Sequence, residues 1–294
     1  MPLLFALAGI STAFALQKRT VNEYAKERVG KLLIPLSFGM LLLIPVQSFI
    51  AGLSFNETAN YFDYFKKLTD LSGYDGGFTP GHLWFLAFLF VISMICIPII
   101  IMHRKNADIG KTADKCPIFA VVLMGVVPLS VWMIKIGGEG FGAFAADFLL
   151  GYFVLSREEI LKKLDKYRFL LLVLMIAGYA WGIHSHNKCQ EFFSWINIIT
   201  VIGFARHYLD FSNKTTAYLA NSSFGIYVFH QSWIVIIGFN TLKLIDSVPL
   251  QIAVIMISSI VVTFVNYEVF RRFKIFRFMF GINNKRATAV RDSH

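Results

Sequence analysis

The sequence predicts an all-α fold, a polytopic transmembrane helical bundle of about nine spans. Hydrophobic residues make up 56% of the 294 residues and only 16% are charged, which is too little polar surface to cover a water-soluble globule. Its apolar residues gather in runs near the roughly 20 residues that a membrane-spanning helix needs. Its cations lie at the ends of these runs, as they do in membrane proteins.

Nine apolar segments follow one another along the chain. They cover residues 2–16, 32–53, 83–102, 118–136, 141–155, 169–184, 192–207, 222–240 and 249–270. The first is short, and the fifth is short, contains Asp147 and has Gly near both ends, so a re-entrant or tilted segment is the alternative there. We expect one transmembrane domain over residues 1–270 and a basic tail over residues 271–294.

The distribution of Lys and Arg predicts one orientation for all nine segments. Alternate connectors, together with the tail, hold 23 of the 28 Lys and Arg residues, and the remaining connectors hold 5. Cytoplasmic loops of membrane proteins are enriched in these residues. The sequence therefore predicts a multi-pass protein of the plasma membrane, with a cytoplasmic C-terminus and an outward-facing Met1.

Neither the net charge nor the cysteines indicate nucleic acid or metal as a partner. The formal charge of +10 is explained by cations at the ends of apolar runs, so the expected surface partner is the lipid bilayer, with no nucleic acid. Cys96, Cys116 and Cys189 show no CxxC spacing and are expected to pack as small apolar residues. His184 and His186 lie near Cys189, but no fourth ligand is apparent, so we predict no metal.

The stretch KRTVNEYAKERVGKLLIP, residues 18–35, concentrates positive charge between the first two apolar runs. Five cations in 14 residues are more than orientation alone requires, and a multiply phosphorylated anion would find a counter-charge here. Positive-inside bias without a ligand is the alternative. The cations are Lys18, Arg19, Lys26, Arg28 and Lys31.

A long outward connector ends in a second candidate site. Residues 54–81 mix aromatic, Asn, Gly and Pro residues and are able to contact a carbohydrate, with a plain surface loop as the alternative. The following GHLWFLAFLFV places His82 and Trp84 at the outer edge of the third segment. Trp at that depth is commonly an interfacial anchor, whereas an imidazole there exchanges protons near neutral pH.

Polar groups within apolar segments mark two further candidates. An acid such as Asp147 normally faces a protein interior or a wet cavity, with a structural pairing to Lys or Ser as the alternative. The stretch ANSSFGIYVFHQSWIVII predicts a helix that begins at residues 221–223 and places His230 near mid-membrane. Tyr227 lies three residues before His230, so both can line one cavity, and a structurally hydrogen-bonded His is the alternative.

The stretch EVFRRFKIFRFMF, at the end of the last apolar segment, alternates cations with aromatic residues. This pattern is typical of a stop-transfer end or of a helix at the lipid surface. Its cations are Arg271, Arg272, Lys274 and Arg277.

Four motifs in this order resemble the acyltransferase-3 family of integral membrane O-acyltransferases, and most closely its glucan-modifying members. They are MPLLFALAGIS, KRTVNEYAKERVGKLLIP, GHLWFL and SSFGIYVFHQSW, and the resemblance runs over nearly the whole chain. It implies ten or more helices, an acyl-CoA donor on the cytoplasmic side and a hydroxyl acceptor, commonly a cell-envelope sugar, on the other side.

Two departures from the family pattern bear on the site. The Arg-x-x-Arg pair thought to meet the donor is matched here by Arg28 and Lys31, and Lys lacks the planar bidentate fork of Arg. Ala8 and Gly9 replace a more usual Ser-Gly pair. The family's first segment, with an acidic-Arg motif and a His regarded as catalytic, has no counterpart before Met1. We therefore expect an upstream helix, or a chain without that base.

Together, the residues and the resemblance predict a membrane enzyme that moves an acetyl or succinyl group from acyl-CoA to a hydroxyl of a cell-envelope glycan. His82 or His230 would take the hydroxyl proton. Arg19, Arg28 and Lys31 would hold the CoA phosphates, and Trp84, Asp147 and Tyr227 would line the substrate cavity.

Two other functions stay open at this point. A transporter or flippase for an envelope lipid or sugar would use Asp147 and His230 as proton-relay or substrate groups. An inactive partner subunit is the other alternative. A homo-oligomer is compatible with each of these functions.

Overall fold

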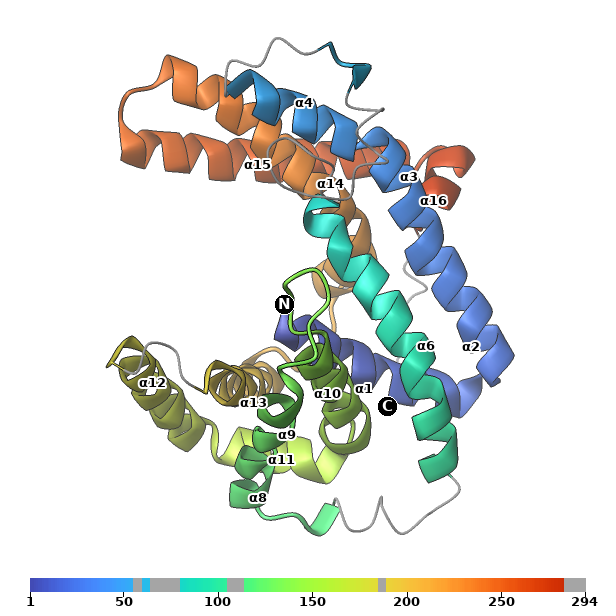
Figure 1. Ribbon diagram of the computed structural model, residues 1–294, viewed down its shortest axis with the longest axis vertical. Helices are drawn as coiled ribbons and strands as arrows, with labels where there is room; N and C mark the ends of the chain where they lie inside the picture. The colour runs from blue at the N-terminus through green and yellow to red at the C-terminus, as the bar shows by residue number, and fades with distance from the viewer. Residues whose placement is uncertain (55–59, 64–79, 105–113, 185–188, 283–294) are drawn as a thin grey trace. The chain divides into compact units, whose positions relative to one another are not determined.

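The computed structural model describes residues 1–54, 60–63, 80–104, 114–184 and 189–282, and its regular elements there are helices (Figure 1). One isolated β-bridge, between Ile136 and Glu139, is the exception. The prediction of an all-α membrane bundle is confirmed. Much of the connectors 54–81 and 103–117, including the predicted carbohydrate contact, lies outside the described residues, as does the tail after residue 282.

Within the described residues, four helical segments are long and apolar enough to cross a membrane, and four shorter ones are also apolar. The long segments are Val21–Ser54, Gly81–Met102, Lys214–Leu244 and Val248–Phe270, and the shorter ones are Pro2–Lys18, Ile118–Val131, Phe141–Leu155 and Arg168–Gly182. Each overlaps one of the nine predicted segments. The remaining predicted segment, 192–207, falls within the helix α13 (Gln190–Tyr208), so the count of nine spans stays a prediction.

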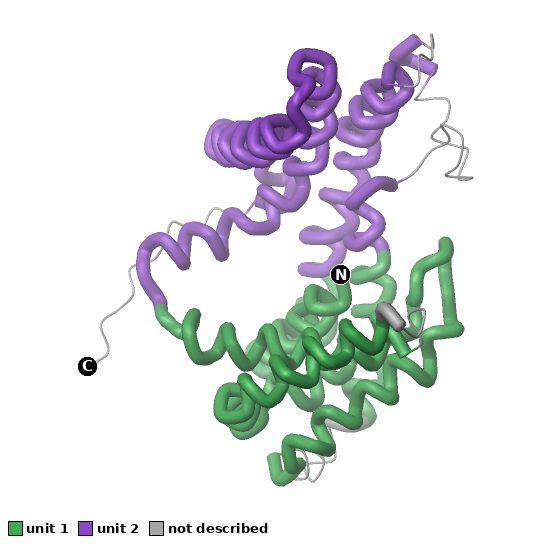
Figure 2. The backbone as a smooth tube through the Cα atoms, turned by 90° about the vertical axis from the view of Figure 1, so that its left-hand side faces the viewer, with its two compact units in different colours: residues 1–26, 88–211 green, residues 27–87, 212–294 purple. Residues whose placement is uncertain are grey.

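The chain folds as two compact units (Figure 2). Unit 1 comprises Met1–Lys26 and Phe88–Phe211, and unit 2 comprises Glu27–Ala87 and Ser212–His294. Unit 1 contains α1 (Pro2–Lys18), most of α6 (Trp84–Arg104), α8 (Ile118–Leu123), α9 (Val126–Val131), α10 (Phe141–Leu150), η4 (Gly151–Leu155), α11 (Glu158–Lys166), α12 (Arg168–His184) and α13. Unit 2 contains η1 (Val29–Leu33), α3 (Ile34–Leu42), α4 (Ile44–Ser54), η3 (Gly81–Leu83), α14 (Lys214–Leu244), α15 (Val248–Phe270) and α16 (Lys274–Met279). The unit boundary cuts α2 (Val21–Arg28).

In unit 1, α1 packs directly on α10 and the π-helix η4 that continues it. Two glycines permit this close approach. A Cβ atom at Gly9 would lie 2.0 Å from the carbonyl oxygen of Phe148, and one at Gly151 would lie 2.2 Å from that of Ala6. Backbone meets backbone at both points, so glycine sets the distance between these helices.

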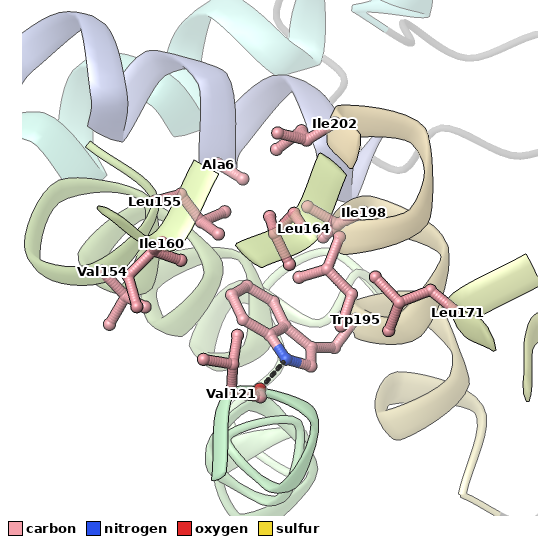
Figure 3. Packing of buried hydrophobic residues seen from close by; sticks show 11 residues of the cluster. Ala6, Val121, Val154, Leu155, Ile160, Leu164, Leu171, Trp195, Ile198 and Ile202 are labelled. Carbon is pink, nitrogen blue, oxygen red and sulfur yellow. Dashed lines mark hydrogen bonds between the residues drawn. The ribbon is translucent and has the colours of Figure 1, made fainter. Parts of the chain in front are cut away.

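The core of unit 1 is built around Trp195, which is fully buried among aliphatic side chains from α8, η4, α11, α12 and α13 (Figure 3). The helix is broken between α8 and α9, where the Gly125 amide donates to Val122 instead of Val121. The indole N–H of Trp195 donates to the freed Val121 carbonyl at 2.8 Å. The buried carbonyl therefore keeps a partner despite the break.

In unit 2, α14 and α15 form an antiparallel hairpin, and α4 lies along α14 (Figure 1). The predicted start of this helix at residues 221–223 is wrong. Asn213 caps α14 instead, because its side chain accepts from the Thr216 amide at 2.8 Å and the Thr216 hydroxyl accepts from the Asn213 amide at 2.9 Å. This reciprocal pair is a capping box, and it outcompetes the polar residues further along.

The basic stretch 18–35 is mostly helical from Val21 onward, and its α-helical bonding changes at η1, which is a π-helix. Pro35 has no N–H to donate to the Lys31 carbonyl. Just before Pro35, the helix changes to the wider π-helical hydrogen bonding. The Ile34 amide there donates to the carbonyl of Val29, five residues earlier. The wider turn changes the angular spacing between Arg28 and Lys31, which are candidates for donor binding.

Candidate active site

Three ring side chains predicted from two separate motifs come together in unit 2. The ring centroid of His82 lies 5.2 Å from that of His230 and 5.5 Å from that of Tyr227. The Tyr227 and His230 centroids are 5.7 Å apart, as neighbours three positions apart on α14. We call these three residues the histidine cluster. The structure thus places His82, from η3, beside Tyr227 and His230, and a cavity lined by them stays a prediction.

Two hydrogen bonds fasten His82 to α14 in opposite directions. His82 Nε2 lies 3.0 Å from the carbonyl oxygen of Val228, and the Tyr227 hydroxyl donates to the carbonyl oxygen of His82 itself. A carbonyl oxygen only accepts, so Nε2 carries the proton in the first bond. Both the imidazole and the backbone of His82 are therefore held by the same turn of α14.

These contacts also fix which imidazole nitrogens have lone pairs. Because Nε2 of neutral His82 is the donor, its Nδ1 is the acceptor, and that atom is buried without a hydrogen-bond partner among the described residues. His230 Nδ1 lies 2.6 Å from the Tyr227 carbonyl oxygen, so it donates and leaves Nε2 as its basic nitrogen. Each histidine thus retains one lone pair for chemistry.

The histidine cluster lies at the middle of α14 and not beside its end. Val228 is 14 residues from Lys214 and 16 from Leu244, which corresponds to about 21 Å and 24 Å along the helix axis. His82 does begin the third apolar segment, as predicted. In unit 2, however, that beginning packs against the centre of a long helix, so His82 is part of a polar site within the bundle.

A residue that the sequence reasoning missed supports the turn before His82. Gln47 on α4 is buried and donates from Nε2 to the Ser232 hydroxyl on α14 at 2.8 Å. Gly81 has a φ of +51°, in the left-handed region that favours glycine, and its Cβ would lie 3.4 Å from Gln47 Oε1. A buried Gln in an apolar segment is the same signal that singled out Asp147, and it would have found Gln47.

Trp84 and Asp147, the remaining substrate-binding candidates, lie in different units. Trp84 is half-buried and begins α6 two residues after His82. Asp147 lies on α10 in unit 1, is 2% exposed, and its Oδ1 has no hydrogen-bond partner among the described residues. The structure therefore shows no pairing of Asp147 Oδ1 with Lys or Ser, which was the structural alternative for this residue. Substrate binding by either residue stays a prediction.

The predicted phosphate-binding cations are divided between the units. Arg19 is exposed at the C-terminal end of α1 in unit 1, whereas Arg28 and Lys31 belong to unit 2. Lys31 Nζ pairs with Glu27 Oε1 at 2.5 Å, and 46% of its side-chain surface is exposed. A phosphate would therefore have to compete with Glu27 for Lys31.

Comparison with known proteins identifies the family. A family model described as an acyltransferase domain, that of the acyltransferase-3 family, matches residues 1–268. No curated protein and no solved structure matches the chain. The family model covers the apolar helices, the basic stretch and the histidine cluster in one match. The chain belongs to the acyltransferase-3 family and is a membrane acyltransferase enzyme.

Proposed function

We propose that this enzyme moves an acetyl or succinyl group from acyl-CoA to a hydroxyl of a cell-envelope glycan, at the plasma membrane. The observation that supports this best is the histidine cluster, where His82 keeps a buried, unpartnered Nδ1 while its other nitrogen and its backbone are held by α14. A base must be both oriented and free to act, and His82 meets both conditions.

His82 acts as the general base in this proposal. Its Nδ1 accepts the proton of the acceptor hydroxyl as that oxygen bonds to the thioester carbonyl carbon. When the carbon–sulfur bond breaks, the same nitrogen returns the proton to the sulfur, so that the products are the ester and the free thiol. No acyl-enzyme is required, and His82 begins and ends the cycle neutral.

His230 is the second basic group of the site. Among the described residues, the hydrogen bond of the His230 imidazole lies within its own helix, to the Tyr227 carbonyl oxygen. The His82 bond to Val228 instead links η3 to α14. The His82 imidazole is thus oriented by a tertiary contact, which favours it as the base and gives His230 a role beside the reacting groups.

The donor is proposed to bind between the basic stretch and the histidine cluster of unit 2. Lys31 and Gly39 are eight helical residues apart, about 12 Å along the axis. A Cβ at Gly39 would touch the side chain of Leu83 at 2.6 Å, so Gly39 lies beside the residue after His82. Acyl-CoA also separates its phosphates from its thioester by a long arm. Arg28 and Lys31, both of unit 2, would hold the phosphates.

The acceptor and the orientation rest on the sequence. The resemblance to glucan-modifying members of the family supports a glycan, and the distribution of cations supports a cytoplasmic C-terminus. The donor would then approach from the cytoplasm and the glycan from the other side. The histidine cluster lies about 21 Å and 24 Å from the two ends of α14, so the proposal requires the thioester arm and the glycan hydroxyl each to reach into the bundle.

The test is label transfer from radiolabelled acetyl-CoA or succinyl-CoA to an envelope glycan fraction by the chain reconstituted in lipid. We expect His82→Gln to lower the rate about 100-fold or more, since general-base catalysis contributes on that order. The Gln amide retains a donor for Val228 but has no basic nitrogen. His230→Gln is expected to have a smaller effect.

His207→Gln is the matched control, because His207 lies in unit 1 and pairs with Asp165 at 2.9 Å. Its transfer rate should equal that of the wild type. A His82→Gln enzyme with wild-type transfer would remove His82 as the base. Absence of transfer from both donors by the wild-type chain would reject the proposed reaction.

A further inference from the structure

The last helix of unit 2 that the structure describes is the short α16, and the exposed surface of this helix and of the two residues before it mixes cations with large apolar side chains. Arg272 and Lys274 are exposed, and Arg277 is half-buried. Among these cations, the exposed fractions are 52% for Phe273, 65% for Ile275 and 62% for Phe278. We call these six residues the α16 surface. The proposed acyl transfer makes no use of it.

Aromatic packing fixes the position of this surface on unit 2. Phe276 stacks on Phe270 at 4.3 Å between ring centroids, and Phe280, which is 2% exposed, contacts Phe229 at 4.7 Å. Gly281 then reverses the chain with a φ of +61°. The exposed residues therefore belong to a segment that is held on unit 2 by the packing of Phe276 and Phe280.

The cations of the α16 surface have no acidic partner among the residues that the structure describes. Glu268 is the nearest acid in the sequence, and residues 269–282 contain no Asp or Glu. Both Glu268 oxygens are already engaged, since Oε1 accepts from the Tyr218 hydroxyl at 2.7 Å and Oε2 pairs with Arg271 Nε at 2.7 Å. In the part of the chain that the structure describes, Arg272, Lys274 and Arg277 form no ion pair.

Helical spacing sorts the α16 surface into two adjoining stripes. Lys274 and Arg277 are three residues apart and lie on one side of the exposed face, and Ile275 and Phe278, with the same spacing, lie beside them. An interfacial helix has this division, with apolar side chains in the hydrocarbon and cations at the level of the phosphates. The surface directly follows α15, which is long and apolar enough to span the bilayer.

We propose that the α16 surface binds the headgroup of an anionic phospholipid through Arg272, Lys274 and Arg277, while Phe273, Ile275 and Phe278 contact its acyl chains. Charge complementarity selects an anion, because these three cations form no ion pair with any residue that the structure describes. The apolar stripe selects a lipid over a free phosphate, which has nothing to bury there. The continuity of α15 with the surface places it where headgroups are present.

Lipid titration of the purified chain in neutral detergent tests this inference. Native mass spectrometry would count bound phosphatidylglycerol and phosphatidylcholine of equal chain length. We expect the wild type to bind phosphatidylglycerol about tenfold more tightly or better, since each cation near an anionic surface contributes appreciably. The preference should shrink as salt is added.

The triple variant Arg272→Gln/Lys274→Gln/Arg277→Gln should lose most of this preference. The charge-conserving variant Arg272→Lys/Lys274→Arg/Arg277→Lys should keep it. A control with the same loss of charge in unit 1 should also keep it, because its positions are exposed cations outside the α16 surface. The control is Lys115→Gln/Lys162→Gln/Lys166→Gln.

A triple Gln variant that retains the wild-type preference would overturn the proposal, as would equal loss in the control. Inorganic phosphate that displaces phosphatidylglycerol completely at equal concentration would overturn the lipid assignment. Should the triple variant not be recovered folded, the single variants Arg272→Gln and Lys274→Gln are measured, since both positions are exposed. Each should lower the preference a few-fold, and two unchanged single variants would reject the site.

Discussion

The core around Trp195 in unit 1 and the histidine cluster in unit 2 each contain a ring N–H that donates to a helical carbonyl. They differ in whether the ring has a further nitrogen without a hydrogen-bond partner. The indole of Trp195 has one polar atom, and Val121 accepts its proton at 2.8 Å. The imidazole of His82 has two, and after the bond to Val228 its Nδ1 stays buried and unpartnered among the described residues. One ring is fully satisfied, whereas the other keeps a lone pair.

The difference separates a structural polar group from a chemical one. A buried polar atom without a partner is costly, so a fold retains one only where something compensates the cost. Around Trp195 the neighbours are aliphatic and the single polar bond is closed. Around His82, tertiary hydrogen bonds fix the ring while one nitrogen stays available. This arrangement is what a general base requires before substrate arrives.

The largest effect on stability is expected where backbones touch in unit 1. A Cβ at Gly9 would lie 2.0 Å from the Phe148 carbonyl oxygen and 2.9 Å from the Tyr152 amide nitrogen. Neither atom can move unless α1 separates from α10. Gly9→Ala should therefore lower the free energy of unfolding by about 3 kcal/mol or more, measured by thermal or denaturant melting in detergent.

Gly30→Ala is the matched control, because a Cβ there meets no atom within 4 Å. That variant should melt at the wild-type temperature or slightly above it, since Ala has the higher helix propensity. Equal melting of the two variants would show that the α1 to α10 contact tolerates a methyl group. It would also weaken the view of this part of unit 1 as a close-packed scaffold.

The next effect compares one lost hydrogen bond in each region. Trp195→Phe leaves the buried Val121 carbonyl without its donor and should cost about 1–3 kcal/mol of stability, with normal activity per folded molecule. Tyr227→Phe releases the His82 carbonyl and with it the backbone that carries the base. We expect kcat to fall about tenfold, with little change in the KM for acyl-CoA.

Melting curves and steady-state transfer assays of the two purified variants make this comparison. The reverse pattern, in which Trp195→Phe lowers kcat and Tyr227→Phe lowers only stability, would contradict the division between scaffold and site. A fall in acyl-CoA affinity alone in Tyr227→Phe would instead support the predicted substrate contact of Tyr227.

The pairing of His82 with His230 could be anticipated only in part from the sequence. Each residue was singled out by its position in an apolar segment, and the three-residue spacing from Tyr227 to His230 fixed their relation. The contact between η3 and the centre of α14 joins residues 146 apart, through His82 and Val228. No local pattern encodes such a contact, because it depends on how helices pack.

Other errors and omissions have local causes. The sequence predicts too late a start for α14, because Asn221 and its neighbours are also favourable N-cap residues. The hydrogen bonds between Asn213 and Thr216 decide in favour of the earlier start. The pairing of Lys31 with Glu27 could be predicted from the sequence, because the two residues are four apart on a helix. The close approach of helices at Gly9 could not be predicted from the sequence, since a single helical glycine does not indicate which helix packs against it.

The smallest effect is expected at an exposed polar pair of unit 1, where neither packing nor chemistry is involved. Lys162 Nζ lies 2.8 Å from Glu159 Oε1 on the surface of α11. The hydrogen bond and the charge of Lys162 lower the pKa of Glu159 from its ordinary value of 4.5. A carboxyl group with a lowered pKa in the fold adds stability above its unfolded pKa and loses it as the pH falls through the folded one.

Water screens this pair, so Glu159→Gln should melt with the wild type at neutral pH within error. Any small difference in melting temperature between the variant and the wild type should disappear as the solution is acidified below the folded pKa of Glu159. The side chain at position 159 is then uncharged in both proteins. Parallel melts of the two proteins at neutral and acid pH measure it. A loss of stability at neutral pH as large as that of Trp195→Phe would mean that α11 depends on its surface charges. The buried core could then no longer be regarded as the main source of stability of unit 1.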